Sequence, residues 1–260
     1  MGTHTPGDRR TVQSVERACE IVAVLKNLDG AGVTEIADRV GMSKGSVHTY
    51  LSTLKQNDYV TEADGVYRIG LRFLEVGEYA KRQEQLYRHG RSPLDELAVE
   101  TGELVRLVVE EHGRGVYLYK AAGENAIETT IHPGQREHLH CTAQGKAILS
   151  QLPESTVLDI VDEFGLPART ENTITELEDL LAELERIRER GVAFSDGEAT
   201  RRLRCVAAPI QAPNGEPMGA LGVFGPTSRL RDERFDETLP NAVTNAANII
   251  EINMQMAATS

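Results

Sequence analysis

The sequence of 260 residues has few cysteines and no long apolar run, and each shortage excludes a class of protein. Its three cysteines, Cys19, Cys141 and Cys205, are too few for a disulfide framework. No apolar stretch approaches the roughly 18 residues of a membrane-spanning helix, and the amino terminus lacks the features of a secretion signal. With 40% hydrophobic residues, the composition predicts a soluble, cytoplasmic chain of two domains without a membrane partner.

Signatures of catalysis are also absent. The chain contains no Ser-His-Asp, HExxH or phosphate-loop pattern. Lys146, which lies near cysteines and histidines, is the one candidate for a nucleophile or base. We expect that the protein is not an enzyme and that it requires no cofactor.

Lysine is scarce, and acidic residues are in excess. Only six of the 28 basic residues are lysine, against 40 acidic residues, and the net charge is −12. This profile is typical of a surface that stays solvated at high ionic strength, so we expect a halophilic source.

The net negative charge of the chain comes from its carboxy-terminal part. Residues 1–88 contain 12 basic and 12 acidic residues, whereas residues 89–260 contain 16 and 28. Residues 39–57 contain no Asp or Glu, and they form the longest acid-free run in the chain. A surface that faces DNA phosphates needs that absence, because each carboxylate would repel the backbone.

The acid-free run overlaps a helical pattern over residues 33–57. A first helix is predicted from the apolar positions Val33, Ile36, Ala37 and Val40. Gly41 permits a sharp turn, and Ser43 can cap a second helix. The apolar positions of that second helix are Val47, Leu51 and Leu54. Two helices joined in this way form a helix-turn-helix.

Flanking segments extend this pattern to a winged helix-turn-helix. Residues 12–28 predict a further helix, with an apolar stripe at Val15, Ala18, Cys19, Val22 and Leu25. Residues 59–69 predict two strands joined by a turn at 63–65. Helix, turn and wing follow one another in the order that this module requires.

The polar side chains of the second helix are candidates for DNA contact. The residues off its apolar stripe, near the end that meets base edges, are Ser43, Lys44, Ser46, His48 and Thr49. Tyr67 and Arg68 in the wing, and Arg9 and Arg10 ahead of it, are candidates for contact with the DNA backbone or minor groove. The alternative is that these residues are only solvated polar groups.

The rest of the chain predicts an α+β domain built on an antiparallel sheet. Residues 71–88 predict a linker helix, and 92–101 predict a separate helix with a Ser-Pro start. Further helices are expected at 143–151, 154–164, 173–190 and 232–256. Strands are expected at 104–110, 115–121, 192–195, 204–211 and 217–224, with a hairpin turn at 212–215.

Four segments together resemble the IclR family of bacterial and archaeal transcription regulators. They are TVQSVERACEIVAVL, MSKGSVHTYLSTL, LHCTAQGKAILS at 139–150, and LRCVAAPIQAPNGEPMGALGVFGPTSR at 203–229. The resemblance implies a winged helix-turn-helix domain (1–70), a linker helix (71–88) and a GAF-like effector-binding and oligomerisation domain (89–260). It also implies a small organic acid or an aromatic acid as effector, a double-stranded DNA operator of pseudo-palindromic sequence, and a homodimer or a homotetramer built from two dimers. Together with the scarcity of lysine, it points to a haloarchaeal member.

The same resemblance, together with helix chemistry, indicates an effector site. Thr142 and Ala143 place backbone N–H groups at the start of a helix, which attracts anions. The residues expected around the effector are Cys141, Thr142, Ala143, Asp196, Cys205, Gly222 and Phe224. Some relatives that bind small keto acids carry serines in the strand that reads LGVF at 221–224 here, so this chain lacks those hydroxyls. Asp196, when ionised, can accept a hydrogen bond from a ligand hydroxyl. We therefore expect a hydroxylated acid, such as a sugar acid, rather than a simple keto acid.

Two alternatives remain open at this point. His138, His140, Cys141 and Cys205 carry nitrogen and sulfur donors, which would suit a zinc-responsive regulator, although buried cysteines are more often small apolar residues. The second alternative is an architectural DNA-binding protein whose carboxy-terminal domain serves only assembly. The favoured hypothesis is a transcriptional regulator of carbon-source catabolism genes that responds to a small organic or sugar acid and binds no metal.

Overall fold

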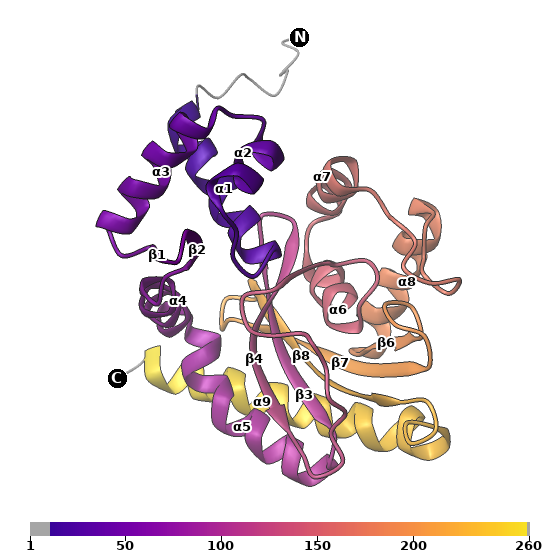
Figure 1. Cartoon of the computed structure of the whole chain (residues 1–260). Coiled ribbons are helices and arrows are strands. Elements are labelled where there is room, and N and C mark those ends of the chain that lie inside the picture. Colours follow the sequence, from indigo (N-terminus) through magenta and orange to yellow (C-terminus); the bar gives the residue numbers. More distant parts are fainter. Residues whose placement is uncertain (1–10, 259–260) are drawn as a thin grey trace. The chain divides into compact units, whose positions relative to one another are not determined.

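The computed structural model describes residues 11–258, so Arg9 and Arg10 lie outside the described residues. The chain forms two compact units, residues 1–80 and 81–260 (Figure 1). No helix among residues 11–258 has the length and apolar character needed to cross a membrane.

The first unit is a three-helix core followed by a two-stranded wing. Its elements are α1 Gln13–Asn27, α2 Val33–Val40, α3 Lys44–Gln56, β1 Val60–Ala63 and β2 Val66–Ile69. Gly41 ends α2 in the left-handed conformation with φ 65°, and the Ser43 hydroxyl accepts the Ser46 N–H at 3.1 Å to begin α3. The strands pair antiparallel, and the winged helix-turn-helix prediction is confirmed.

The predicted apolar stripe of α1 is partly wrong. Ile21 and Leu25 are the residues that α1 buries in the core, whereas Val15 is 60% exposed and Cys19 is exposed. The helix has two adjacent apolar faces, and periodicity alone could not tell which of them packs against α2 and α3.

Two helices, rather than the single predicted linker helix, follow the wing. Helix α4 Arg72–Gln83 spans the boundary between the units, and α5 Gln85–Thr101 starts after Glu84. The predicted start of a separate helix at residue 92 is wrong, because α5 runs through Pro93. The proline removes one N–H from the helix, and the burial of Leu86, Leu94 and Leu97 on both sides of it keeps the segment helical.

A six-stranded antiparallel sheet forms the centre of this unit, in the order β5-β4-β3-β8-β7-β6. Its strands are β3 Leu104–Glu111, β4 Arg114–Ala122, β5 Arg136–His138, β6 Ala193–Asp196, β7 Leu203–Gln211 and β8 Pro217–Pro226. The remaining helices are α6 Ala143–Gln151, α7 Glu154–Phe164, α8 Leu177–Arg190, a short π-helix Arg234–Thr238 and α9 Leu239–Ala258. The antiparallel α+β prediction is confirmed.

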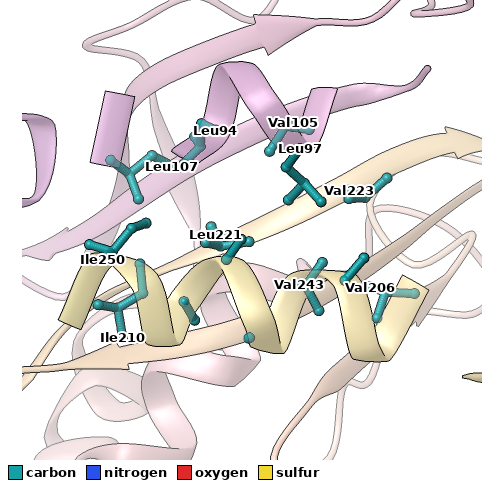
Figure 2. Close-up of a cluster of buried hydrophobic side chains, with 14 of the residues drawn as sticks. Leu94, Leu97, Val105, Leu107, Val206, Ile210, Leu221, Val223, Val243 and Ile250 are labelled. Atoms are coloured by element: carbon teal, nitrogen blue, oxygen red, sulfur yellow. The ribbon is translucent and has the colours of Figure 1, made fainter. Parts of the chain in front are cut away.

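The two faces of the sheet pack against different helices. Helices α5 and α9 cover one face, where Leu107, Leu221 and Val223 join an apolar cluster (Figure 2). Helix α6 covers the opposite face (Figure 1). Val108 and Ala220 point to that face and join a second apolar cluster. Successive strand residues point to opposite faces, so each central strand contributes to both layers.

A buried ion pair fixes the loop after β6 onto α6. Lys146 is 2% exposed, and its ammonium lies 2.7 Å from both carboxylate oxygens of Glu198. The hydroxyls of Thr170 and Thr173 donate to the Glu198 carbonyl oxygen at 3.2 and 2.7 Å. Burial raises the pKa of Glu198, and the Lys146 ammonium opposes that rise. This contact holds the loop at a fixed distance from the sheet.

Removing one member of this pair is expected to destabilise the protein strongly. Lys146→Met leaves the Glu198 carboxylate buried without its cation, and we expect a loss of about 3–5 kcal/mol in the free energy of unfolding. The double variant Lys146→Met/Glu198→Met removes both charges and should recover most of that loss. Denaturant titration measures the three proteins, with Lys55→Met, in the exposed Lys55–Glu62 pair, as a control that changes little. A double variant as unstable as the single one would contradict the assignment.

Candidate nucleic-acid interface and ligand pocket

The amino-terminal half of α3 presents an exposed polar surface. Lys44 and His48 extend exposed side chains from it. The Ser43 and Ser46 hydroxyls lie 2.9 Å apart, and the Thr49 hydroxyl donates to the Gly45 carbonyl oxygen at 3.1 Å. All five predicted contact residues of this helix are therefore exposed, but three of them use their hydroxyls locally.

The two candidates in the wing differ in position. Arg68 is exposed, whereas Tyr67 is 7% exposed and packs in the core of the first unit. Neighbouring strand residues face opposite sides, so only one of the two can point outward. The backbone of Tyr67 also pairs with Ala31 through N–H···O bonds of 2.9 and 3.0 Å. The structure thus assigns Tyr67 to packing, and Arg68 is the one of these two side chains that faces solvent.

A cavity of about 210 Å³ opens on the α6 side of the large sheet. Strands β3, β4, β7 and β8 form its floor, and the start of α6 and the loop after β6 form its walls. Its lining residues are Arg106, Tyr117, Thr130, Ile131, Gln135, Glu137, Thr142, Ala143, Gln144, Arg169, Ser195, Ala199, Thr200, Cys205 and Phe224. Most of these side chains are polar, so the cavity suits a polar ligand.

Four of the seven predicted effector residues line this cavity. They are Thr142, Ala143, Cys205 and Phe224. Cys141 does not line it, because its buried thiol is directed at the His138 carbonyl oxygen, 3.4 Å away. Gly222 does not line the cavity either, because the Gln144 amide lies directly over it. A Cβ at this position would lie 2.8 Å from Gln144 Nε2.

Asp196 lies outside the cavity lining, contrary to the position expected from the sequence. Its exposed carboxylate accepts from Arg204 at 2.7 Å, and its neighbour Ser195 lines the cavity instead. Ser195 pairs with Cys205 across β6 and β7, whereas Asp196 pairs with Arg204. Alternation along β6 therefore points Ser195 toward the cavity and Asp196 away from it.

Sequence analysis missed the charged groups of the cavity, and Arg106 is the most deeply buried of them. It is 3% exposed, and its guanidinium carbon lies 4.3 Å from the ring centre of Phe224 and 5.4 Å from that of Tyr117. Burial lowers the pKa of Arg106, raises that of Tyr117 to about 12 and raises that of Cys205 to about 12. The phenol and the thiol are thus neutral at pH 7. The sequence carried one signal for this buried charge, which is the arginine within the otherwise apolar strand LVRLVV.

One ion pair also lines the cavity, between Glu137 and Arg169. Glu137 is half-buried, and the Arg169 guanidinium lies 3.8 Å from its carboxylate. At the start of α6, the Thr142 hydroxyl accepts the Gly145 N–H at 3.0 Å and so caps its own helix. The cavity therefore contains two guanidinium groups and one carboxylate.

The residues considered as zinc ligands have other contacts. The rings of His138 and His140 meet edge to face at 5.5 Å, and His140 Nε2 lies 3.2 Å from the Pro167 carbonyl oxygen. Burial lowers the pKa of both imidazoles and raises the pKa of Cys141 to about 12. Among residues 11–258, no three His, Cys, Asp or Glu side chains are placed to hold a metal ion. The ammonium of Lys146, the candidate nucleophile, forms an ion pair with the Glu198 carboxylate.

Comparison with known families matches both units. A family described as "IclR helix-turn-helix domain" matches residues 14–64, and one described as "Bacterial transcriptional regulator IclR C-terminal" matches residues 79–251. The curated "Probable HTH-type transcriptional regulator ArcR" of Halobacterium salinarum is 34% identical over 255 residues, which cover 96% of this chain and 97% of the relative.

Solved structures give the same result. The crystal structure of Thermotoga maritima IclR is 30% identical, with a TM-score of 0.76 over 93% of this chain and 98% of that one. An IclR homolog from Microbacterium hydrocarbonoxydans, complexed with 4-hydroxybenzoate, is 19% identical, with a TM-score of 0.80 over 94% and 99% of the two chains. At that identity, the second likeness concerns the fold alone.

Proposed function

The chain belongs to the IclR family of transcriptional regulators and is a DNA-binding regulator, and we propose that a small organic acid in the cavity of its second unit controls operator binding. The genes under its control would serve catabolism of a carbon source that yields such an acid. The observation that supports an effector most directly is the partly open polar cavity that contains a buried guanidinium.

Operator recognition is assigned to α3 and the wing. Lys44 and His48 are exposed near the amino end of α3, where recognition helices meet base edges, and Arg68 is exposed on the wing. Ser43, Ser46 and Thr49 remain candidates for base contact, because a hydroxyl whose proton is used within the helix can still accept a hydrogen bond from a base amino group. The lack of carboxylates over residues 39–57 supports this face over any other face of the first unit.

A homodimer is the proposed DNA-binding form, with association of two dimers as a further step. Val12, Val15, Leu71, Leu74 and Tyr79 of the first unit are between 60% and 83% exposed. A single soluble unit seldom leaves so many large apolar side chains in water, so their exposure supports association. Two equivalent winged units would then meet two half-sites of a pseudo-palindromic operator.

The effector is proposed to be an organic acid and the working environment to be saline. The Microbacterium homolog was crystallised with 4-hydroxybenzoate, which is such an acid. The first of the relatives reported above comes from Halobacterium salinarum, and the acidic, lysine-poor composition suits high salt. Because salt weakens phosphate contacts, base contacts must supply more of the operator affinity.

Substitution on α3 tests the recognition surface. Lys44→Ala and His48→Ala should each weaken operator binding about tenfold, because each removes a contact made only with DNA. The matched control is Lys55→Ala, at the opposite end of the same helix, which should bind as the wild type does. Fluorescence anisotropy at several salt concentrations measures affinity, and a slope reduced by about 1 for Lys44→Ala identifies a phosphate contact. Equal affinity for all four proteins would exclude this helix face.

Footprinting tests the symmetry. A dimer should protect a pseudo-palindrome whose half-sites lie about 34 Å apart, or a multiple of that distance. Genomic footprinting with and without candidate carbon sources would also identify the operators. A single asymmetric footprint produced by a monomer would contradict the dimer.

A further inference from the structure

Arg106 carries a buried charge that its surroundings do not neutralise. Among the described residues, no carboxylate forms an ion pair with it, and its Nε has no hydrogen-bond partner. One terminal nitrogen donates to the Thr129 hydroxyl at 3.1 Å, and two aromatic rings flank the guanidinium. Aromatic faces attract a cation, but they do not accept its N–H bonds in the way that a carboxylate does. A buried unpaired charge is costly, so an anionic partner would stabilise this site.

Gln144 supplies a second unsatisfied donor beside the first. Its Nε2 is buried without a partner among the described residues, while its Oε1 faces the Cys205 thiol at 3.5 Å. Arg106 pairs with Gly222 across β3 and β8, and the Gln144 amide lies over Gly222. The absence of a side chain at Gly222 thus leaves room for the Gln144 amide in the cavity that Arg106 also lines. Arg106 Nε and Gln144 Nε2 both carry N–H groups, so the ligand atoms that meet them must be hydrogen-bond acceptors.

We propose that Arg106 and Gln144 form the carboxylate-binding subsite of this cavity and that the ligand is a small hydroxylated monocarboxylic acid. This inference rests on the proposed function, because it names the chemical class of the effector. The guanidinium and the amide donate to the carboxylate oxygens, and the body of the ligand extends toward Glu137, Ser195 and Thr200. At the start of α6, by contrast, the Gly145 N–H already has an acceptor in the Thr142 hydroxyl.

The charges of the cavity limit the ligand to one carboxylate. The Arg169 guanidinium lies 3.8 Å from the Glu137 carboxylate, so these two charges offset each other. The positive charge of Arg106 is then the one that a ligand must neutralise. A second carboxylate on the ligand would lie near Glu137 and would be repelled. Glu137, Ser195 and Thr200 offer acceptors for hydroxyl groups, so a hydroxylated acid gains hydrogen bonds that an acid without hydroxyls cannot make.

The volume of the cavity limits the size of the ligand. A closed protein cavity of about 150 Å³ holds benzene, which has six non-hydrogen atoms. The present cavity of about 210 Å³ is partly open, so it should hold about six to ten such atoms. Glycerate and threonate fall within this range and are suitable probes.

A first experiment needs no ligand. If the Arg106 charge is kept for binding, Arg106→Met should raise the melting temperature of the unliganded protein, by about 2–4 °C. The matched control is Arg204→Met, because Arg204 also stacks on a phenylalanine ring, at 4.6 Å from Phe235, but has its carboxylate in Asp196. Its removal should not raise the melting temperature. A marked fall for Arg106→Met would assign Arg106 to packing and overturn the proposal.

A second experiment measures binding by calorimetry at fixed salt. The probes are glycerate and threonate, their primary amides, butyrate as an acid without hydroxyls, and succinate as a diacid. The wild type should bind a hydroxy acid and should bind its amide, butyrate and succinate more weakly. Arg106→Gln should weaken binding of the hydroxy acid about 10- to 100-fold, Arg106→Lys should weaken it less, and Gln144→Leu should weaken it several-fold.

The outcomes separate this inference from the proposed function. A wild type that binds a hydroxy acid with the same affinity as Arg106→Gln overturns the subsite and leaves the effector-controlled regulator intact. A wild type that binds operator DNA but none of the acids overturns the ligand class. A wild type that binds a hydroxy acid but has the same operator affinity with and without that acid contradicts the proposed function itself.

Discussion

The alternation of side chains along β3, β7 and β8 is the constraint on which the second unit depends. Because each strand passes between α6 on one side and α5 with α9 on the other, every second residue must be apolar on the α5–α9 face. The opposite positions have more freedom, since part of the α6 face borders the cavity. Arg106, Cys205 and Phe224 occupy such positions, and the core behind them keeps their backbone rigid. A shift of one residue in register would bury Arg106 under α5, so the hydrophobic core also fixes the chemistry of the cavity.

Local signals were enough to predict much of the fold. Helices α6 and α7 begin and end at the predicted residues, and the wing turn at 63–65 was also predicted from its residues. The errors arose where tertiary packing decides between local alternatives. Pro93 favoured a helix start, but the buried leucines on both sides of it maintain α5. On α1, two apolar faces were available, and only the packing of α2 and α3 selects Ile21 and Leu25.

The cavity was predicted less completely than the fold. Cys205 and Phe224 were placed correctly beside Thr142, although more than 60 residues separate Cys205 from Thr142 in the sequence. Asp196 was misplaced by a single position of strand alternation, because the bounds of the short strand β6 do not reveal which face each residue takes. Arg106 was overlooked because an arginine in an apolar strand has no local partner that marks it as functional. Its role becomes visible only when the registers of β3 and β8 place it beside Gly222 and below Gln144.

Gly222 gives natural selection a simple way to change which effector this scaffold recognises. A methyl group at this position would lie 2.8 Å from the Gln144 amide and 3.0 Å from the Ala207 Cβ, so the amide would have to move. The strand itself would keep its pairing, since only one side chain changes and the backbone φ here is an ordinary one. Duplicated copies of such a gene can therefore change the proposed carboxylate subsite by mutation at one codon, while α5, α9 and the DNA-binding unit keep their original sequences.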